Sequence, residues 1–440
     1  MSVTGTKSSG SDFVGLNEAL KHQYTEPMQT NIEGEMEVAD AFKDAGDFET
    51  VDGPDGKQIN IGHYLSAGGG VSFMNEDDTF IDDTPPEWKQ GYVTIPQLGA
   101  RVTLSGRTLR RVKAGPAAFA TWAEQALTEK AKRVGFHKDR ALMGTGTGII
   151  GRINGAPDGT GDAIDDMFGI SGLGSALPLI GRGDALRYGP NADGSSLRTG
   201  NVVVAALNFG ADTFNTTVAG SAATATSAAD NDYVFLGDGN VNSAGKEFMG
   251  LEGMIDDGTN VTTFQGLTRS AYPETMYAQV VDSSTYAVAP GTLGEDVIDY
   301  ADSLAGQRAG GKTDLILVNR SGQRSFWRSL KGDRQINDPQ GQYVGGKRKN
   351  GLRMILGDRE VIVKAATKVP VSRAYGVDTS VMRRFKVSAG RWDDTTGAIW
   401  NRVLSSGAPK DAVYALWVEE EQYACFYPAR CWKIKGLSST

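Results

Sequence analysis

The sequence predicts an α+β protein in which an extended start and a charged hairpin precede a long helix, a β-rich region and an α/β unit. Apolar residues between Pro116 and Leu142 recur mostly at three- and four-residue steps, the spacing of an amphipathic helix. Glycine supplies 57 of the 440 residues, roughly twice average usage. Much of it falls between Gly144 and Gly258, which indicates turns between short strands. A helix over 293–308, a buried strand over 314–319 and a helix over 321–331 then predict the α/β unit.

The first 70 residues have little core-forming pattern and are predicted to form an extended arm. Short helical pieces are expected over 13–24 and 38–43, and turn-forming residues over 52–56 interrupt the segment. An arm of this kind needs other surfaces on which to lie.

The predicted hairpin carries opposite charge on its two flanks. Residues 76–87 contain six acids and no base, and residues 101–113 contain five bases and no acid. Segments 92–95 and 101–104 have strand composition and are predicted to be its strands. The charged residues are Glu76, Asp77, Asp78, Asp82, Asp83 and Glu87 on one flank, and Arg101, Arg107, Arg110, Arg111 and Lys113 on the other.

A run of like charge is most often a solvated face, and pairing between copies of the chain is the sharper alternative. One exposed ion pair contributes only about 0.2–1 kcal/mol, so a single pair decides nothing. The same pair repeated at every contact of a closed lattice would set the register of that lattice.

The β-rich region follows a glycine-rich turn at the end of the long helix. Gly146, Gly148 and Gly151 form a G-x-G-x-x-G pattern, but the pattern follows a helix and precedes a loop, which is the reverse of a dinucleotide site. We therefore expect helix capping and a turn there. Asp257-Gly258 is a strong turn dipeptide, and the apolar positions around it fit short paired strands. Further strands are predicted over 201–205, 232–236, 261–264, 277–281, 352–356, 361–363 and 412–417.

No catalytic, cofactor or metal site is predicted. The three histidines, at positions 22, 63 and 137, have no metal-ligand spacing. Asp238, Asn240 and Asn242 mimic the start of a calcium loop, but Ser243 and Met249 stand where its glycine and bidentate glutamate belong. The cysteines, Cys425 and Cys431, are too sparse for a disulfide framework and are expected to be reduced core residues.

The formal charge of −8 and the pI near 5.2 argue against a protein that gains its affinity by wrapping nucleic acid, since that affinity comes from Lys and Arg neutralising phosphates. The acidic charge does not exclude a container for DNA, because a shell can confine its contents mechanically. The sequence has no run of 18 apolar residues and no secretory signal pattern, so we expect synthesis in the cytoplasm and no membrane partner.

Two segments carry a resemblance to a known family. Gly250–Gly258, GLEGMIDDG, and Thr263–Ser270, TFQGLTRS, resemble a segment of the major capsid proteins of tailed double-stranded DNA bacteriophages. The order of predicted elements is similar over nearly the whole chain. The resemblance implies an N-terminal arm over 1–70, an E-loop hairpin over 71–115, a peripheral domain over 116–290 with its spine helix at 116–142, and an α/β axial domain over 291–440 whose last strands return to the peripheral sheet. Residues 158–229 exceed a minimal peripheral domain and suggest a surface elaboration or a decoration site.

The resemblance implies a structural protein, not an enzyme, that assembles into pentamers and hexamers of an icosahedral shell. Such a shell encloses a double-stranded DNA genome without sequence-specific binding, is part of the virion, and needs no cofactor. A portal is an implied partner, and a decoration protein is a further candidate partner. No scaffolding-like segment precedes the arm, so we expect scaffolding to be a separate protein. No matched lysine, asparagine and catalytic glutamate can be placed, so no covalent crosslink is predicted.

The resemblance also places seven charged residues at contacts between subunits and two apolar residues in the packing of the spine helix. The charged residues are Asp82, Asp83, Arg110, Arg111, Lys347, Arg348 and Lys349. The apolar residues, Trp122 and Leu127, are expected to pack the spine helix against the peripheral sheet.

Two alternatives remain open. An encapsulin-like nanocompartment would close into a small particle with an inner groove for a cargo peptide, whereas a phage shell needs hexamers, a portal vertex and room for a genome. A β-rich binding module or an enzyme would instead be a small oligomer of fixed size.

Overall fold

The computed structural model describes residues 36–45, 49–52, 58–76, 78–105, 116–155, 157, 159–218, 228–238, 241–287, 289–329, 352–356, 359–393, 401–405 and 408–438. As far as these are described, the chain forms two compact units. The first comprises Met1–Ala39, Pro96–Glu247 and Ser388–Glu421, and the second comprises Asp40–Ile95, Phe248–Val387 and Gln422–Thr440. The predicted domain limits concern roles within a shell, and they stay predictions. The predicted helix over 13–24 lies outside the described residues.

The long helix of the first unit is α4, Pro116–Met143. Its apolar spacing predicted a helix over 116–142, and the structure confirms it. Gly146 and Gly148 follow the helix with φ of +79° and +75°, values that favour glycine. A Cβ at Gly148 would lie 2.0 Å from the carbonyl oxygen of Ser243. The glycine pattern therefore ends the helix in a tight turn, as predicted.

A small antiparallel barrel makes up much of the rest of the first unit. Its strands run in the order β6-β5-β10-β7-β8-β9, with β11 beside β10. A bridge between Asp162 and Phe214 brings β9 back beside β6 and closes the ring. The strands predicted over 201–205 and 232–236 correspond to β8 and β10. The strand bounds are β5 Ile149–Asn154, β6 Ala163–Asp165, β7 Ala185–Gly189, β8 Val202–Asn208, β9 Thr213–Val218, β10 Tyr233–Asp238 and β11 Val241–Asn242.

A five-stranded sheet contains two strands, β19 and β21, that each contribute residues to both units. The order is β1-β19-β21-β20, and β4 also pairs with β21. The bounds are β1 Glu49–Asp52, β4 Gln97–Ser105, β19 Met382–Trp392, β20 Asn401–Ser405 and β21 Ala408–Cys425. The strand predicted over 412–417 is thus the middle of a strand of 18 residues.

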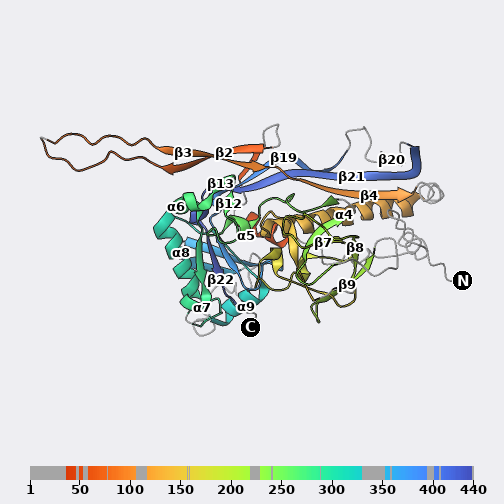
Figure 1. The fold of residues 1–440 in the computed structure, drawn as a ribbon. Helices are drawn as coiled ribbons and strands as arrows, with labels where there is room; N and C mark the ends of the chain where they lie inside the picture. Colours follow the sequence, from red (N-terminus) through yellow and green to blue (C-terminus); the bar gives the residue numbers. More distant parts are fainter. Residues whose placement is uncertain are drawn as a thin grey trace. The chain divides into compact units, whose positions relative to one another are not determined.

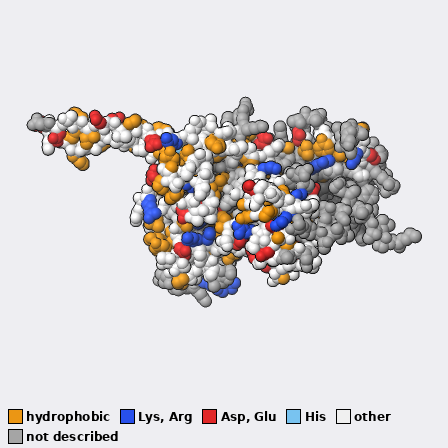
Figure 2. All heavy atoms as spheres, in the orientation of Figure 1, with side chains coloured by type: hydrophobic (Ala, Val, Ile, Leu, Met, Phe, Trp, Pro, Cys, Tyr) orange, Lys and Arg blue, Asp and Glu red, His pale blue; other side chains and the backbone are white. Residues whose placement is uncertain are grey.

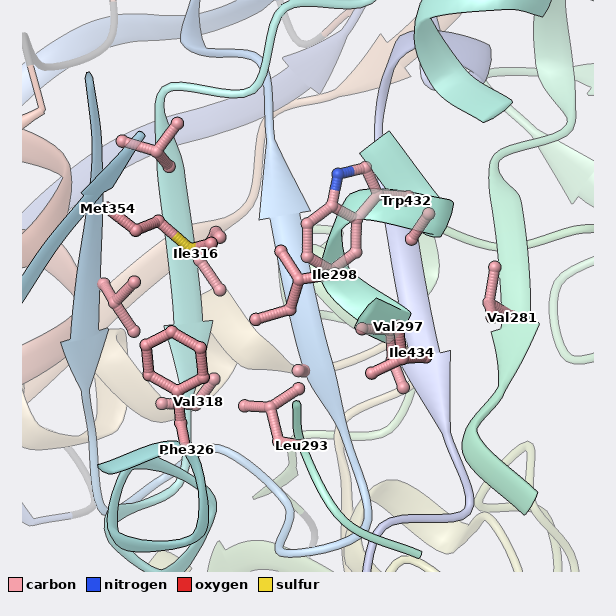
Figure 3. Close-up of a cluster of buried hydrophobic side chains, with 14 of the residues drawn as sticks. Val281, Leu293, Val297, Ile298, Ile316, Val318, Phe326, Met354, Trp432 and Ile434 are labelled. Atoms are coloured by element: carbon pink, nitrogen blue, oxygen red, sulfur yellow. The ribbon is translucent and has the colours of Figure 1, made fainter. Parts of the chain in front are cut away.

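The second unit is built on a six-stranded mixed sheet in the order β14-β22-β18-β15-β17-β16. Its core packs between the sheet and the helices α8, Glu295–Ala309, and α9, Arg320–Ser329 (Figure 3). All four residues of β15 are buried. The predicted α/β unit is therefore confirmed. The strand bounds are β14 Gln279–Asp282, β15 Leu315–Val318, β16 Leu352–Leu356, β17 Arg359–Ala365, β18 Ala374–Val377 and β22 Trp432–Lys435.

Short elements make up the two segments that carry the family resemblance. The prediction of paired strands around Asp257-Gly258 is wrong, because Leu251–Met254 forms the helical turn α5. Pairing occurs later, between β12, Thr263–Phe264, and β13, Leu267–Thr268. The remaining helical elements are α2 Glu37–Asp44, α6 Pro273–Met276, α7 Ser283–Tyr286, η2 Met167–Gly169, η3 Leu177–Leu179, η4 Arg269–Ala271, η5 Thr379–Val381 and η6 Pro428–Arg430.

The hairpin of the second unit differs from the prediction in its strand pairing. The predicted pairing of 92–95 with 101–104 is wrong, because β3, Glu87–Thr94, pairs with β2, Gln58–Ser66. The second predicted strand, β4, pairs with β21 instead. Pro96 separates the two strands and favours extended backbone at the residue before it. The hairpin therefore begins inside the segment that was predicted as arm.

Candidate functional site

The hairpin formed by β2, β3 and the connecting residues 67–86 projects from the second unit (Figure 1). We call the described residues of this connection, 67–76 and 78–86, the tip. Its two runs lie side by side, joined by a hydrogen bond from the Gly69 amide to the Thr84 carbonyl. A Cβ at Gly68 would lie 2.0 Å from that carbonyl oxygen, so glycine permits the close approach. All but one of the residues of the tip are exposed.

The tip combines large apolar side chains with acids. Val71, Phe73 and Phe80 are 96%, 106% and 84% exposed. The sequence has no Lys or Arg between residues 67 and 86. Figure 2 shows hydrophobic and acidic side chains along the projecting hairpin. A soluble monomer rarely exposes an apolar patch of this kind, which usually marks an interaction site.

The structure places two of the seven predicted contact residues. Asp82 and Asp83 lie on the tip and are exposed, which is compatible with the predicted role. Arg110, Arg111, Lys347, Arg348 and Lys349 lie outside the described residues. The backbone of Trp122 and Leu127 belongs to α4, but their side chains are outside the described part of the chain. Their predicted contacts stay predictions.

The base of the hairpin is fixed by a small apolar cluster. Ile59 and Ile61 of β2 and Val93 of β3 pack with Phe385 and Ala424. On β3, burial ends at Gly91, and the residues from Glu87 to Gln90 are all exposed. Only the inner part of the hairpin is therefore held by its own unit.

A two-residue turn contacts the hairpin where its burial ends. Gln265 and Gly266 join β12 to β13 with φ of +51° and +77°, the signature of a type I′ turn. The carbonyl of Gln265 accepts a hydrogen bond of 2.8 Å from the Tyr92 amide, and its side-chain amide donates to the carbonyl of Cys425 at 3.1 Å. Because Gln265 is not a favoured residue at positive φ, these two bonds explain how the strained position is held. The turn ties β3 to the end of β21.

Arg269 holds this turn to the neighbouring helical turn α5. Its guanidinium is fully buried and donates to the carbonyl oxygens of Asp256 at 2.9 Å, Met276 at 2.7 Å and Met254 at 3.2 Å, and also to that of Gly253. It also lies 4.4 Å from the centre of the Phe264 ring. Burial lowers the pKa of Arg269 to about 10, which leaves the side chain charged at neutral pH.

Below α5 lies a buried ionic cluster of Glu252, Asp256, Tyr375 and Lys433. The Lys433 ammonium is 3.0 Å from Oε1 of Glu252 and 3.0 Å from Oδ1 of Asp256. The Tyr375 hydroxyl donates to Oε2 of Glu252 at 2.5 Å. Each of these residues is at most 2% exposed. The cluster joins α5 to β18 and β22 of the six-stranded sheet.

Asp256 has a second set of partners in the turn that follows it. Its Oδ2 accepts from the amides of Gly258, Asn260 and Val261 at 3.0–3.1 Å. Burial alone would raise the pKa of Asp256, but Lys433 and the amides of Val261 and Asn260 hold it below its usual range. The predicted turn is confirmed, and its carboxylate bonds the local backbone as such turns do.

Sequence reasoning missed the ionic cluster, because charged residues are almost never fully buried unless they are paired. One signal was present in the apolar neighbours of Lys433, since Trp432 and Ile434 flank it and all three are buried. Nothing in the spacing of Glu252, Tyr375 and Lys433 along the chain indicates that they meet.

Among the described residues, no group of three or more His, Cys, Asp or Glu side chains could hold a metal ion. Within the same part of the chain, no helix is long and apolar enough to cross a membrane. Cys425 and Cys431 are buried and form no disulfide, and the contact with Cys425 together with burial raises the pKa of the Cys431 thiol. Both cysteines are therefore reduced core residues, as predicted.

Comparison with known proteins identifies the fold. No family model matches the chain, and no curated protein matches its sequence. The capsid of cyanophage A-1(L) is similar in structure, with a TM-score of 0.54 at 10% identity over 94% of this chain and 96% of that one. The capsid of Myoviridae phage XM1 gives 0.43 at 10% identity over 96% and 98% of the two chains. An encapsulin complex from Synechococcus elongatus gives 0.41 at 8% over 97% and 96%.

The likeness to the cyanophage capsid carries the assignment, because the other two TM-scores are below 0.5. The chain has the mixed α+β fold of phage capsid subunits, as the two glycine-containing segments predicted.

Proposed function

We propose that this chain is the major capsid protein of a tailed double-stranded DNA bacteriophage. In this role it assembles into pentamers and hexamers of an icosahedral shell that encloses the genome without reading its sequence. The protein acts structurally and not as an enzyme. Scaffolding, portal and any decoration protein are separate partners, and the mature protein resides in the virion.

The exposed apolar tip of the hairpin, on a phage capsid fold, carries this proposal. Burying a phenylalanine side chain contributes about 1.5–3 kcal/mol, so covering Phe73 and Phe80 favours association by a few kcal/mol per contact. Assembly repeats the contact over many subunits, which lets individually weak contacts produce a closed particle. The acids around the phenylalanines favour a basic partner surface on the next copy.

Electron microscopy of the purified protein tests the proposal. Closed icosahedral particles, or rings of five and six subunits, are expected. Particle diameter and packaged DNA separate a phage shell from a small protein compartment. A monodisperse monomer or dimer that persists at high salt and under crowding would contradict the shell function altogether.

A variant pair tests the role of the tip. Replacing Phe73 and Phe80 by serine should weaken each contact by about tenfold to a hundredfold per ring and abolish closed particles, with little change in subunit unfolding. The control variant is Phe209→Ser, because Phe209 is 67% exposed and lies in the first unit, away from the tip in the sequence. Equal assembly defects in the two variants would show a general effect of surface polarity and would refute the role of the tip.

A further inference from the structure

We infer that Gly91 and the Gln265-Gly266 turn are positioning elements that set the direction in which the hairpin leaves its unit. This inference rests on the proposed function, in which the tip must reach a neighbouring subunit. It gives the TFQG segment a mechanical role that composition and turn type do not reveal.

The first observation is the position of the contact along the hairpin. Gly91 is the outermost buried residue of β3, and its cross-strand partner is Ile61 of β2. Everything beyond Gly91 on β3 is exposed. On β2, burial continues to His63, which lies opposite Lys89. The contact with the turn therefore lies within two residue pairs of the point where the hairpin leaves its unit.

The second observation is the closeness of the two backbones. A Cβ at Gly91 would lie 2.8 Å from the Gln265 carbonyl oxygen and 2.9 Å from Nε2 of His63. A Cβ at Gly266 would lie 2.3 Å from Cε1 of Tyr92. The lack of a side chain at Gly91 and at Gly266 therefore allows the hairpin and the turn to approach each other this closely. The hydrogen bond from the Tyr92 amide to Gln265 then fixes the separation at 2.8 Å.

The third observation is the rigid support behind the turn. Arg269 bonds four carbonyl oxygens of the surrounding backbone. Asp256, whose carbonyl is one of the four, is ion-paired to Lys433 of the six-stranded sheet. The turn is therefore fixed to the sheet, and a displacement at Gly91 moves the hairpin relative to its own unit.

The length of the hairpin amplifies a small displacement. Because an extended chain spans about 3.3 Å per residue, the segment from Gly91 to Glu76 gives a lever of at most about 50 Å. A rotation of about 10° at its base moves the far end by about 9 Å, which is enough to miss a side-chain pocket on another subunit.

The test is Gly91→Ala, with Gly62→Ala as the matched control. Both glycines lie in the hairpin strands and neither has positive φ, but a Cβ at Gly62 would have no atom within 4 Å. Spin labels on Ser72→Cys in the tip and Asp299→Cys on α8 report the hairpin direction in dissociated subunits. Both sites are exposed, and the two native cysteines are buried.

Gly91→Ala should shift the label distance by several ångströms or broaden its distribution, and should lower the yield of closed particles by about tenfold. Gly62→Ala should change neither. An unaltered distance together with unaltered particles in Gly91→Ala would overturn the inference, as would equal shifts in the two variants.

A second variant covers the case in which Gly91→Ala does not fold. Gly266→Ala reaches the same contact from the turn side, and Gly310→Ala controls for its positive φ, because a Cβ at Gly310 would meet no atom within 4 Å. Adding Tyr92→Ala to Gly266→Ala should restore the wild-type distance. The distance is measured on single subunits, so it tests the inference even if the wild-type protein formed no particles, which would refute the proposed function alone.

Discussion

Replacing Arg269 by methionine is expected to destabilise the subunit strongly. Methionine keeps much of the volume of the side chain but removes every hydrogen bond from its guanidinium to the four carbonyl oxygens. A hydrogen bond to a charged group contributes about 1.5–3 kcal/mol, and leaving a buried acceptor unsatisfied costs about 1–3 kcal/mol. These contributions are not additive within one network.

Two further effects set the magnitude of the loss. Burying the guanidinium already costs free energy, as its lowered pKa shows, and part of that cost is recovered when the charge is removed. Stacking on Phe264 at 4.4 Å contributes about 0.5–2 kcal/mol, and much of that is lost. Removing one partner from a buried charged network typically costs about 3–5 kcal/mol, so we expect Arg269→Met to lower the free energy of unfolding by about 4 kcal/mol.

Urea unfolding of dissociated subunits, followed by circular dichroism, measures this loss. Arg269→Lys should be intermediate, because a compact ammonium has three donors and cannot span four carbonyls. Arg182, which is exposed, provides the control, and Arg182→Met should stay within about 0.5 kcal/mol of wild type. A loss below about 1 kcal/mol for Arg269→Met would show that the carbonyl oxygens find other donors. It would also show that Arg269 is not needed to hold the turn in place.

Two more predictions concern pH. Lys433→Met should lower the free energy of unfolding by about 3–5 kcal/mol at neutral pH. The loss should shrink as the pH falls into the acidic range, because removing the cation raises the pKa of Asp256 relative to wild type and the variant then binds a proton first. A pH-independent loss in urea titrations would contradict this. His137 pairs with Asp184, but burial lowers its pKa, so the unfolded chain binds the proton first and stability falls as pH drops below about 6.5. Between pH 7.5 and 5.5, His137→Gln should lose less free energy of unfolding than wild type. The pKa of His63 is also lowered by burial, but His63 is present in both proteins. An equal loss in the two proteins would therefore refute the assignment of this pH effect to His137.

Elements with a local pattern could be predicted from the sequence. The helix α4 and the strand β15 follow from periodicity and from a short apolar run, which depend on neighbouring residues alone. The two cysteines were correctly expected in the core. These predictions succeed because burial of one helix face or of a whole strand leaves a mark within a few residues.

Strand pairing could not be predicted in the same way. Segment 101–104 has the composition of a hairpin strand, yet β4 finds its partner in β21, far along the chain. The composition of a strand does not specify its partner, and nothing within a few residues of segment 101–104 points to β21. The short turn α5 was missed for a related reason, because two of its carbonyl oxygens are bonded by Arg269, which lies outside the turn.

The tip of the hairpin and its support depart from the usual distribution of residues in opposite directions. Phe73 and Phe80 are apolar side chains in water, and Glu252, Asp256 and Lys433 are charged side chains in the core. Exposed rings lower solubility unless another copy covers them, and a buried ion pair is often no more stable than apolar residues of the same shape. Neither feature is explained by the stability of the single subunit.

Both features are explained if the subunit must present the tip in one direction. Under that requirement, Glu252 and Lys433 can be replaced by apolar residues of similar volume together with Tyr375→Phe and Asp256→Asn. The asparagine keeps a side-chain oxygen that accepts from the three backbone amides bonded by Asp256. This variant should leave the free energy of unfolding nearly unchanged. The same variant should broaden the label distance between hairpin and α8, because the new core no longer fixes α5 and the turn at one position. Stability retained with direction lost would separate the two roles of the cluster. A narrow, wild-type distance in that variant would show that packing alone orients the hairpin.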